Sequence, residues 1–118
     1  IKSFKIVVDN GLDYSKKYIN RDKTDELFLK KDSCDEIIIL KNGVVTDTSI
    51  ANIAIFYDGV WITSKNCLLE GTSRARLIEK KEIFEKDISL DILKKASKIA
   101  LMNAMIDFYE IKYFRIED

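Results

Sequence analysis

Four short segments of the chain carry side chains whose types and spacing could do chemistry. The first surrounds Lys17, which follows Lys16 and precedes the run 18–21 (Tyr, Ile, Asn, Arg). A lysine that faces a pocket can form a Schiff base with a carbonyl when its surroundings free the lone pair of the amine. On spacing alone, two adjacent lysines indicate solvated charge, so this segment is weak evidence without the others.

The second segment is the polar stretch 46–52, which interrupts two apolar runs and contains Asp47 among Thr and Ser residues. A carboxylate in such a place commonly accepts hydrogen bonds from backbone N–H groups and closes a turn. It can also be a buried acid that stays ionised to pair with a cationic partner. The residues themselves leave both interpretations open.

The third and fourth segments are 71–74 (Gly, Thr, Ser, Arg) and 101–105. Because 71–74 precedes a predicted helix, its N–H groups and the positive end of the helix dipole suit a phosphate. An ordinary cap by Thr72 or Ser73 explains the same pattern. Segment 101–105 is either a buried strand or the wall of a pocket, with Met102 and Met105 expected in the core.

The amino-acid composition excludes several kinds of catalytic and binding sites. The 118 residues include 20 Lys and Arg, 20 Asp and Glu, and no His, and 47% of them are hydrophobic, which fits one folded domain over 1–118. Without His, the chain has no Ser-His-Asp, Cys-His or His-metal mechanism of its own. Two cysteines, Cys34 and Cys67, cannot complete a zinc site, so we expect no metal and two reduced core thiols, as in a cytoplasmic protein. The neutral charge balance and the short apolar runs argue against nucleic-acid and membrane binding.

Tight turns and β-branched runs predict a sheet. Asn-Gly at 10–11 and 42–43 and Asp-Gly at 58–59 favour positive φ and therefore hairpins. We expect a first strand at 4–8, a short helix over 20–31, and an antiparallel set of strands at 35–41, 44–46, 53–57 and 60–63. Later elements are a helix from 72 or 73 to 79, a strand at 83–88, a helix from Ser89 with apolar positions 90, 93, 96 and 99/100, and strands at 101–105 and 110–116. The fold class is α+β with a mostly antiparallel sheet.

Taken together and in this order, the segments resemble the class IV fold type of pyridoxal-phosphate enzymes. This group contains branched-chain aminotransferases, D-amino acid aminotransferases and 4-amino-4-deoxychorismate lyases. The resemblance rests on five motifs: a K-x-x-N-R run from Lys17, a D-E pair at 35–36 that opens a hydrophobic strand, an acid-x-x-x-x-N segment from Asp47 to Asn52, a G-[IT]-[TSM]-R phosphate loop at 71–74, and Asn103-Ala104 at the place of a further phosphate-binding stretch. It implies a pseudo-barrel with flanking helices, similar to the larger C-terminal domain of D-amino acid aminotransferase-like enzymes.

The resemblance also implies residue roles around pyridoxal 5'-phosphate. Lys17 would be the Schiff-base lysine, and Asp47, where the family usually carries Glu, would keep the pyridine nitrogen protonated. The remaining implied cofactor contacts are Ser49, Ile50 and Ala51 under the ring, and Thr72, Ser73, Asn103 and Ala104 around the phosphate.

The function implied is that of a lyase resembling 4-amino-4-deoxychorismate lyase, which releases pyruvate and 4-aminobenzoate in folate biosynthesis. The alternatives are a class IV aminotransferase acting on branched-chain or D-amino acids, and a non-catalytic relative with the same fold. The resemblance further implies a small-molecule amino substrate and a homodimer. It also leads us to expect that the family's small N-terminal domain is absent from this chain.

Overall fold

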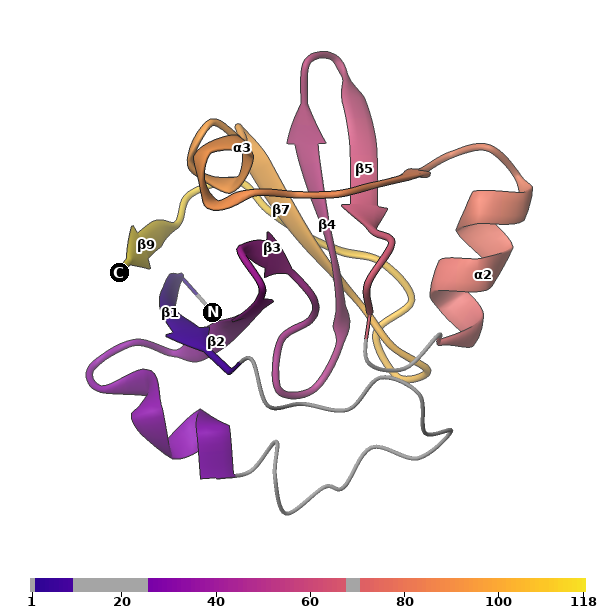
Figure 1. Cartoon of the computed structure of the whole chain (residues 1–118). Coiled ribbons are helices and arrows are strands. Elements are labelled where there is room, and N and C mark those ends of the chain that lie inside the picture. Colours follow the sequence, from indigo (N-terminus) through magenta and orange to yellow (C-terminus); the bar gives the residue numbers. More distant parts are fainter. Residues whose placement is uncertain (1, 10–25, 68–70) are drawn as a thin grey trace.

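A computed structural model describes residues 2–9, 26–67 and 71–118, and places their strands in two sheets. The first sheet has the order β3-β2-β1-β9 and the second the order β6-β5-β4-β7-β8 (Figure 1). The strands are β1 (Ser3–Val8), β2 (Glu36–Lys41), β3 (Val44–Val45), β4 (Asn52–Tyr57), β5 (Val60–Ser64), β6 (Phe84–Lys86), β7 (Lys98–Met102), β8 (Tyr109–Ile111) and β9 (Arg115–Glu117). The helices are the 3-10 turn η1 (Leu29–Lys31), α2 (Thr72–Glu79) and α3 (Leu90–Lys94). The predicted α+β class is confirmed.

Two of the predicted hairpins are present, and they belong to different sheets. Asn42 and Gly43 join β2 to β3 with φ of 53° and 83°, and Asp58 and Gly59 join β4 to β5 with φ of 53° and 82°. These values suit the type I′ turns that match the twist of antiparallel strands. The third predicted turn, at 10–11, lies outside the described residues.

The prediction of one antiparallel set at 35–63 was wrong in its arrangement. The segment between Val45 and Asn52 carries the chain from the first sheet to the second, so the two hairpins never pair with each other. In the first sheet β1 lies between parallel neighbours, β2 and β9. In the second sheet only the pair β5 and β6 is parallel, so the antiparallel expectation holds there.

Alternation along the strands builds the core. In β2, Ile38 and Leu40 point into the space between the sheets, whereas Ile37 and Ile39 pack on the outer face against Leu27. The second sheet repeats the pattern, since the odd-numbered residues of β4 and β7 (Ile53, Ile55, Ile99 and Leu101) join the central core and Ala54, Ala100 and Met102 pack on the outer face. Strands buried on both faces explain the uninterrupted apolar runs in the sequence.

The second half of the chain departs from the predicted elements. Ser89 caps α3 as expected, because its Oγ accepts the N–H of Ile92 at 3.2 Å, but the helix ends at Lys94. Residues 98–102 form β7, which lies between β4 and β8 in the second sheet, so the strand predicted at 101–105 ends at Met102. Burial between two neighbouring strands overrides a helical spacing that continues for only one more turn. The strand predicted at 110–116 is divided between β8 and β9.

Smaller predictions have mixed outcomes. The helix predicted over 20–31 is helical at 26–31 within the described residues. Met102 is buried as expected, but Met105 is 95% exposed because it lies in the loop after β7. Neither cysteine forms a disulfide; Cys34 is a core thiol and Cys67 is only partly buried. Among the described residues, no helix has the length and apolar character needed to cross a membrane.

Candidate functional site

Three of the four segments singled out by the sequence converge in the structure. The turn after β3, the first turn of α2 and the loop after β7 lie toward the same end of the molecule, near the foot of β4 (Figure 1). Hydrogen bonds connect each of these three segments to the other two. The fourth segment, around Lys17, lies outside the described residues, so its position relative to the others stays a prediction.

Asp47 is directed into the protein by an irregularity in the hairpin β2–β3. The N–H of Thr46 donates to the carbonyl of Ile39 at 2.8 Å, and the N–H of Ile39 donates to the carbonyl of Asp47 at 2.8 Å. Thr46 and Asp47 therefore both pair with Ile39, which is the pattern of a β-bulge. Such bulges change the direction of side chains and are common next to functional sites. The Asp47 side chain is 4% exposed.

The carboxylate of Asp47 is linked to the start of α2 through one side chain. Asn52 Nδ2 donates to Asp47 Oδ1 at 2.9 Å, and the N–H of Gly71 donates to Asn52 Oδ1 at 3.1 Å. A Cβ at Gly71 would lie 2.7 Å from Asn52 Oδ1, so only glycine admits this approach without a shift of the amide. The φ of Gly71 is −72°, so the requirement is for space and not for backbone freedom. The acid and the helix terminus thus form one connected unit.

Residues 48–51 form a compact turn between Asp47 and Asn52. The Oγ1 of Thr48 donates to the carbonyl of Ala51 and accepts the N–H of Ala51, both at 3.0 Å. Ser49 and Ala51 are buried, whereas Ile50 is 43% exposed at the tip. The predicted contacts at 49–51 are therefore held in a defined conformation, and Ile50 offers the accessible apolar surface.

The start of α2 keeps the features of an anion site. Gly71 is the N-cap, and no side chain of the described residues caps the helix, so the structure does not show the ordinary cap by Thr72 or Ser73 that was one of the two interpretations of this segment. The first N–H groups of an α-helix have no partner inside the helix, and the dipole is positive there. Thr72 is exposed and Ser73 is buried, with the Ser73 hydroxyl donating to the carbonyl of Asn103 at 3.1 Å.

Arg74, the last residue of the phosphate-loop motif, has its side chain directed toward β5 and β6. Its guanidinium donates to the carbonyl of Ser64 at 2.9 Å and to Glu85 Oε2 at 2.7 Å, and the side chain is 3% exposed. These contacts fasten α2 to β5 and β6. The motif therefore combines a helix terminus for an anion with an arginine that fixes the direction of the helix.

Asn103 organises the loop after β7. Its Oδ1 accepts the N–H groups of Met105 at 2.9 Å and Ile106 at 2.6 Å, and its Nδ2 donates to the carbonyl of Ile50 at 3.2 Å. The side chain thus ties the loop to the turn after Asp47. Ala104 beside it is exposed, so Ala104 is the more accessible residue of this predicted pair.

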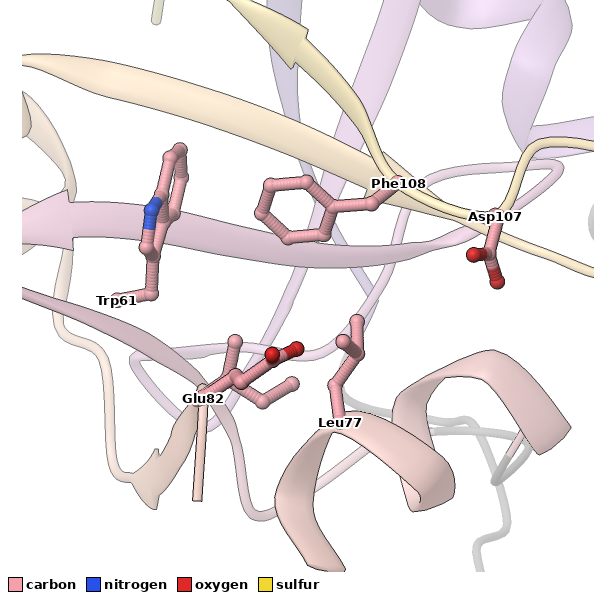
Figure 2. A pocket seen from close by; sticks show the side chains of 6 residues that line it. Trp61, Leu77, Glu82, Asp107 and Phe108 are labelled. Carbon is pink, nitrogen blue, oxygen red and sulfur yellow. The ribbon is translucent and has the colours of Figure 1, made fainter. Parts of the chain in front are cut away.

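A separate cleft of about 380 Å³ lies on the outer face of the second sheet, beside the C-terminal half of α2. Figure 2 shows the rings of Trp61 and Phe108 on one side of it and the side chains of Leu77 and Glu82 on the other. The two rings meet edge to face, with centroids 5.0 Å apart. None of the predicted site residues lines this cleft.

The clearest electrostatic effects on titration lie in the first sheet. Burial raises the pKa of the Cys34 thiol, and its hydrogen bond to Glu117 at 2.7 Å adds to the effect. The same bond lowers the pKa of the Glu117 carboxyl. Backbone N–H groups of Lys2 and Ser3 lower the pKa of Asp35. These groups fasten β1, β2 and β9 together.

Comparison with known proteins assigns this chain to a family. The sequence profile of the family described as amino-transferase class IV matches residues 15–114. An uncharacterized protein of Haemophilus influenzae is 36% identical over 104 residues, which span 88% of this chain and 55% of that protein. The chain belongs to the class IV aminotransferase family.

Solved structures agree on the fold. A Haemophilus somnus protein provisionally named a 4-amino-4-deoxychorismate lyase superposes with a TM-score of 0.80 at 41% identity, over 89% of this chain and 54% of that one. A branched-chain amino acid aminotransferase from T.th. superposes with a TM-score of 0.78 at 18% identity, over 98% and 43% of the two chains, which is a likeness of fold alone. The chain spans about half the length of these relatives.

Two residues gain importance only in three dimensions. Asn52 closes the motif that begins at Asp47, but only the structure shows that it joins the acid to Gly71. Glu36 belongs to the D-E pair, and the structure places its carboxylate in the interior, 2% exposed, against Ser49. A glutamate at the start of a strand gives no sequence signal of burial, since glutamate is almost never fully buried unless it is paired.

Proposed function

We propose that this chain is the cofactor-bearing part of a pyridoxal-phosphate-dependent lyase resembling 4-amino-4-deoxychorismate lyase. The observation that carries the proposal is the chain of contacts from Asp47 through Asn52 to Gly71. It joins a buried acid to an uncapped helix terminus, and a Cβ at Gly71 would break it. A pyridine ring with a phosphate arm needs an acid at one end and an anion site at the other, so these residues fit the cofactor.

Each group of residues has its own part in this proposal. Asp47 holds a proton at the pyridine nitrogen, and Asn52 keeps that carboxylate in place. The N–H groups of Thr72 and Ser73 bind the phosphate, with the Ala104 backbone on its other side and Asn103 holding that loop. Ser49, Ile50 and Ala51 support the face of the ring.

The bound cofactor supplies a conjugated, electron-accepting ring that stabilises negative charge on the reacting carbon of the substrate. Lys17, once the substrate amine has replaced it and left it as a free amine, would remove a proton from the carbon that bears the substrate nitrogen and would return one as the ether bond to the enolpyruvyl group breaks. The products are pyruvate and 4-aminobenzoate, a precursor in folate biosynthesis. The turn at 48–51 and the neighbouring core exclude water from the acid.

Similarity favours the lyase over the second candidate, a class IV aminotransferase for branched-chain or D-amino acids. The identity is 41% to the provisionally named lyase from Haemophilus somnus and 18% to the branched-chain aminotransferase from T.th.. The alternative stays relevant because both reactions begin with the same proton removal by the lysine. We propose further that the complete enzyme is a cytoplasmic homodimer, in which the additional length present in its relatives supplies much of the substrate contact.

The test uses the full-length protein. Addition of pyridoxal phosphate should give a visible absorption band, and borohydride reduction followed by peptide mapping should place the label on Lys17. Lys17→Ala should abolish the label, whereas Lys16→Ala should keep it. A label on another residue, or no band in a folded protein, would contradict the proposal and favour a non-catalytic relative.

The substrate decides between the two reactions. Incubation with 4-amino-4-deoxychorismate should release 4-aminobenzoate and pyruvate in equal amounts. Transfer of the amino group to a keto acid without an aromatic product would establish the aminotransferase instead. Asp47→Asn should lower the rate in either case while the protein stays folded, because the amide cannot stabilise a protonated ring nitrogen as a carboxylate does.

A further inference from the structure

Glu36 is a buried carboxylate to which the proposed chemistry gives no part. It is the first residue of β2, pairs with Phe4 of β1 and is 2% exposed. Removing a charge from water is costly unless hydrogen bonds and partners replace the lost hydration. A carboxylate this deeply buried therefore requires hydrogen-bond partners inside the protein.

One of these partners lies in the turn that follows Asp47. The hydroxyl of Ser49 donates to Glu36 Oε1 at 2.6 Å, and the N–H of Ser49 approaches the same oxygen at 3.4 Å. The N–H of Ile37 also donates to it, at 2.8 Å, which fixes the carboxylate against its own strand. A short bond from a hydroxyl to a carboxylate oxygen belongs to the strong, charge-assisted class.

Strand β2 therefore forms hydrogen bonds to the polar segment 46–52 at two points. The backbone of Ile39 holds Thr46 and Asp47, and the side chain of Glu36 holds Ser49. Only Thr48 separates the attachment at Asp47 from the attachment at Ser49. Both attachments restrict the backbone of residues 46–49 relative to β2 and so set the direction of the Cα–Cβ bond of Asp47, while Asn52 holds the carboxylate itself.

We propose that Glu36 is a positioning residue of the site, which acts through Ser49 to fix the direction of Asp47 toward the cofactor. This inference rests on the proposed function, because it requires Asp47 to be a cofactor contact. It gives the D-E pair of the sequence a role that differs for its two members. Asp35 fastens the strands, and Glu36 sets the geometry of the acid.

The experiment compares three variants of the full-length protein. Glu36→Gln keeps the shape and removes the charge, Ser49→Ala removes the hydroxyl, and the double variant removes both. Thr63→Val is the matched control, since it deletes another buried hydroxyl, which donates to the carbonyl of Ile53 at 2.7 Å in β4, without touching the site. If Glu36→Gln does not fold, Ser49→Ala tests the same bond from its other end through hydrogen exchange without cofactor, because Ser49 is itself a proposed cofactor contact.

Three measurements are made on each protein. They are the dissociation constant for pyridoxal phosphate, the pH midpoint at which the visible band of the bound cofactor changes, and hydrogen exchange of segment 46–52 without cofactor. Glu36→Gln and Ser49→Ala should each weaken cofactor binding about tenfold, shift the pH midpoint and speed exchange in 46–52. The double variant should be no worse than the more affected single variant, because both changes remove one bond. Thr63→Val should lower stability alone.

Several outcomes would overturn the inference. Unchanged exchange in 46–52 would show that Glu36 does not hold the turn. Faster exchange with an unchanged pH midpoint and affinity would reduce Glu36 to a structural role, and multiplying effects in the double variant would show that the residues act independently. A wild-type protein that shows no band refutes the proposed function itself, and the inference with it.

Discussion

Substitution of Gly71 by alanine tests the link between the acid and the helix start. The new Cβ would lie 2.7 Å from Asn52 Oδ1, where ordinary contacts begin at 3.4 Å, so the amide must retreat by about 0.7 Å. Asn52 is 6% exposed and donates to Asp47 at 2.9 Å, so it cannot move without loosening its own hydrogen bonds. We expect Gly71→Ala to destabilise the protein and to weaken cofactor binding.

The magnitude follows from the bonds at risk. The Gly71–Asn52 bond is neutral and contributes about 0.5–1.5 kcal/mol, and the Asn52–Asp47 bond has a charged acceptor and contributes about 1.5–3 kcal/mol. Loss of both costs about 2–4.5 kcal/mol, to which alanine at an N-cap adds about 1 kcal/mol. In an Asn52→Ala background the obstructing amide is absent, so Gly71→Ala should cost only the capping difference of about 1 kcal/mol.

The assay is a double-mutant cycle on the free energy of unfolding, measured by urea denaturation of the wild type, the two single variants and the double variant. The coupling between positions 52 and 71 should be about 2–4.5 kcal/mol, because the steric conflict exists only when both the amide and the Cβ are present. A coupling below about 0.5 kcal/mol would mean that the two substitutions are independent. The reasoning about a shared unit would then be refuted.

Three further predictions concern regions outside the site. The pKa of Asp35 is lowered in the folded state because the N–H groups of Lys2 and Ser3 donate to its carboxylate. The stability that Asp35 adds is therefore present above its unfolded pKa and lost as the pH falls through its folded pKa. Asp35→Asn should lower the urea midpoint at pH 7, and the difference from wild type should disappear in acid. Burial raises the pKa of Cys34, so iodoacetamide at pH 8 should alkylate Cys67 at least ~10-fold faster in the native protein, and equal native rates would contradict the buried thiol. Phe108→Ala should lower the free energy of unfolding by about 2 kcal/mol, which is less than the loss of a fully buried phenylalanine. It should also change the fluorescence of Trp61, the single tryptophan, because the two rings are in contact. An unaltered spectrum would mean that the Phe108 ring does not contact Trp61.

Local sequence signals account for much of the first half of the fold. Asn-Gly at 42–43 and Asp-Gly at 58–59 could be predicted as hairpin turns because positive φ is accessible to few other residues. The sequence could not show that the two hairpins lie in different sheets, since both are flanked by the same kind of apolar run. That distinction depends on long-range pairing with β1 and β7.

The second half was harder to predict because two patterns overlap. The apolar positions after Ser89 continue at helical spacing as far as Ile99, while residues 99–102 also form an apolar run that suits a buried strand. Tertiary pairing resolves the conflict, since Lys98–Met102 has β4 on one side and β8 on the other. No window of local sequence contains those partners.

For the candidate site, the resemblance named the segments, and the structure shows how three of them are connected. Three of them meet through Asn52, Ser73 and Asn103, each of which uses its side chain to bind another segment. Such contacts span many residues of chain, so spacing within a motif cannot reveal them. The part of the prediction that depends on Lys17 still awaits the labelling experiment.

The crossing of the chain between the sheets at 46–52 has a mechanical consequence. The two sheets share few covalent passages, and this one carries the proposed cofactor acid. A molecule bound there would act as a clamp across the boundary, so its binding free energy would resist separation of the two halves of the core. The loaded protein should melt at a higher temperature than the empty one, by an amount that grows with cofactor concentration.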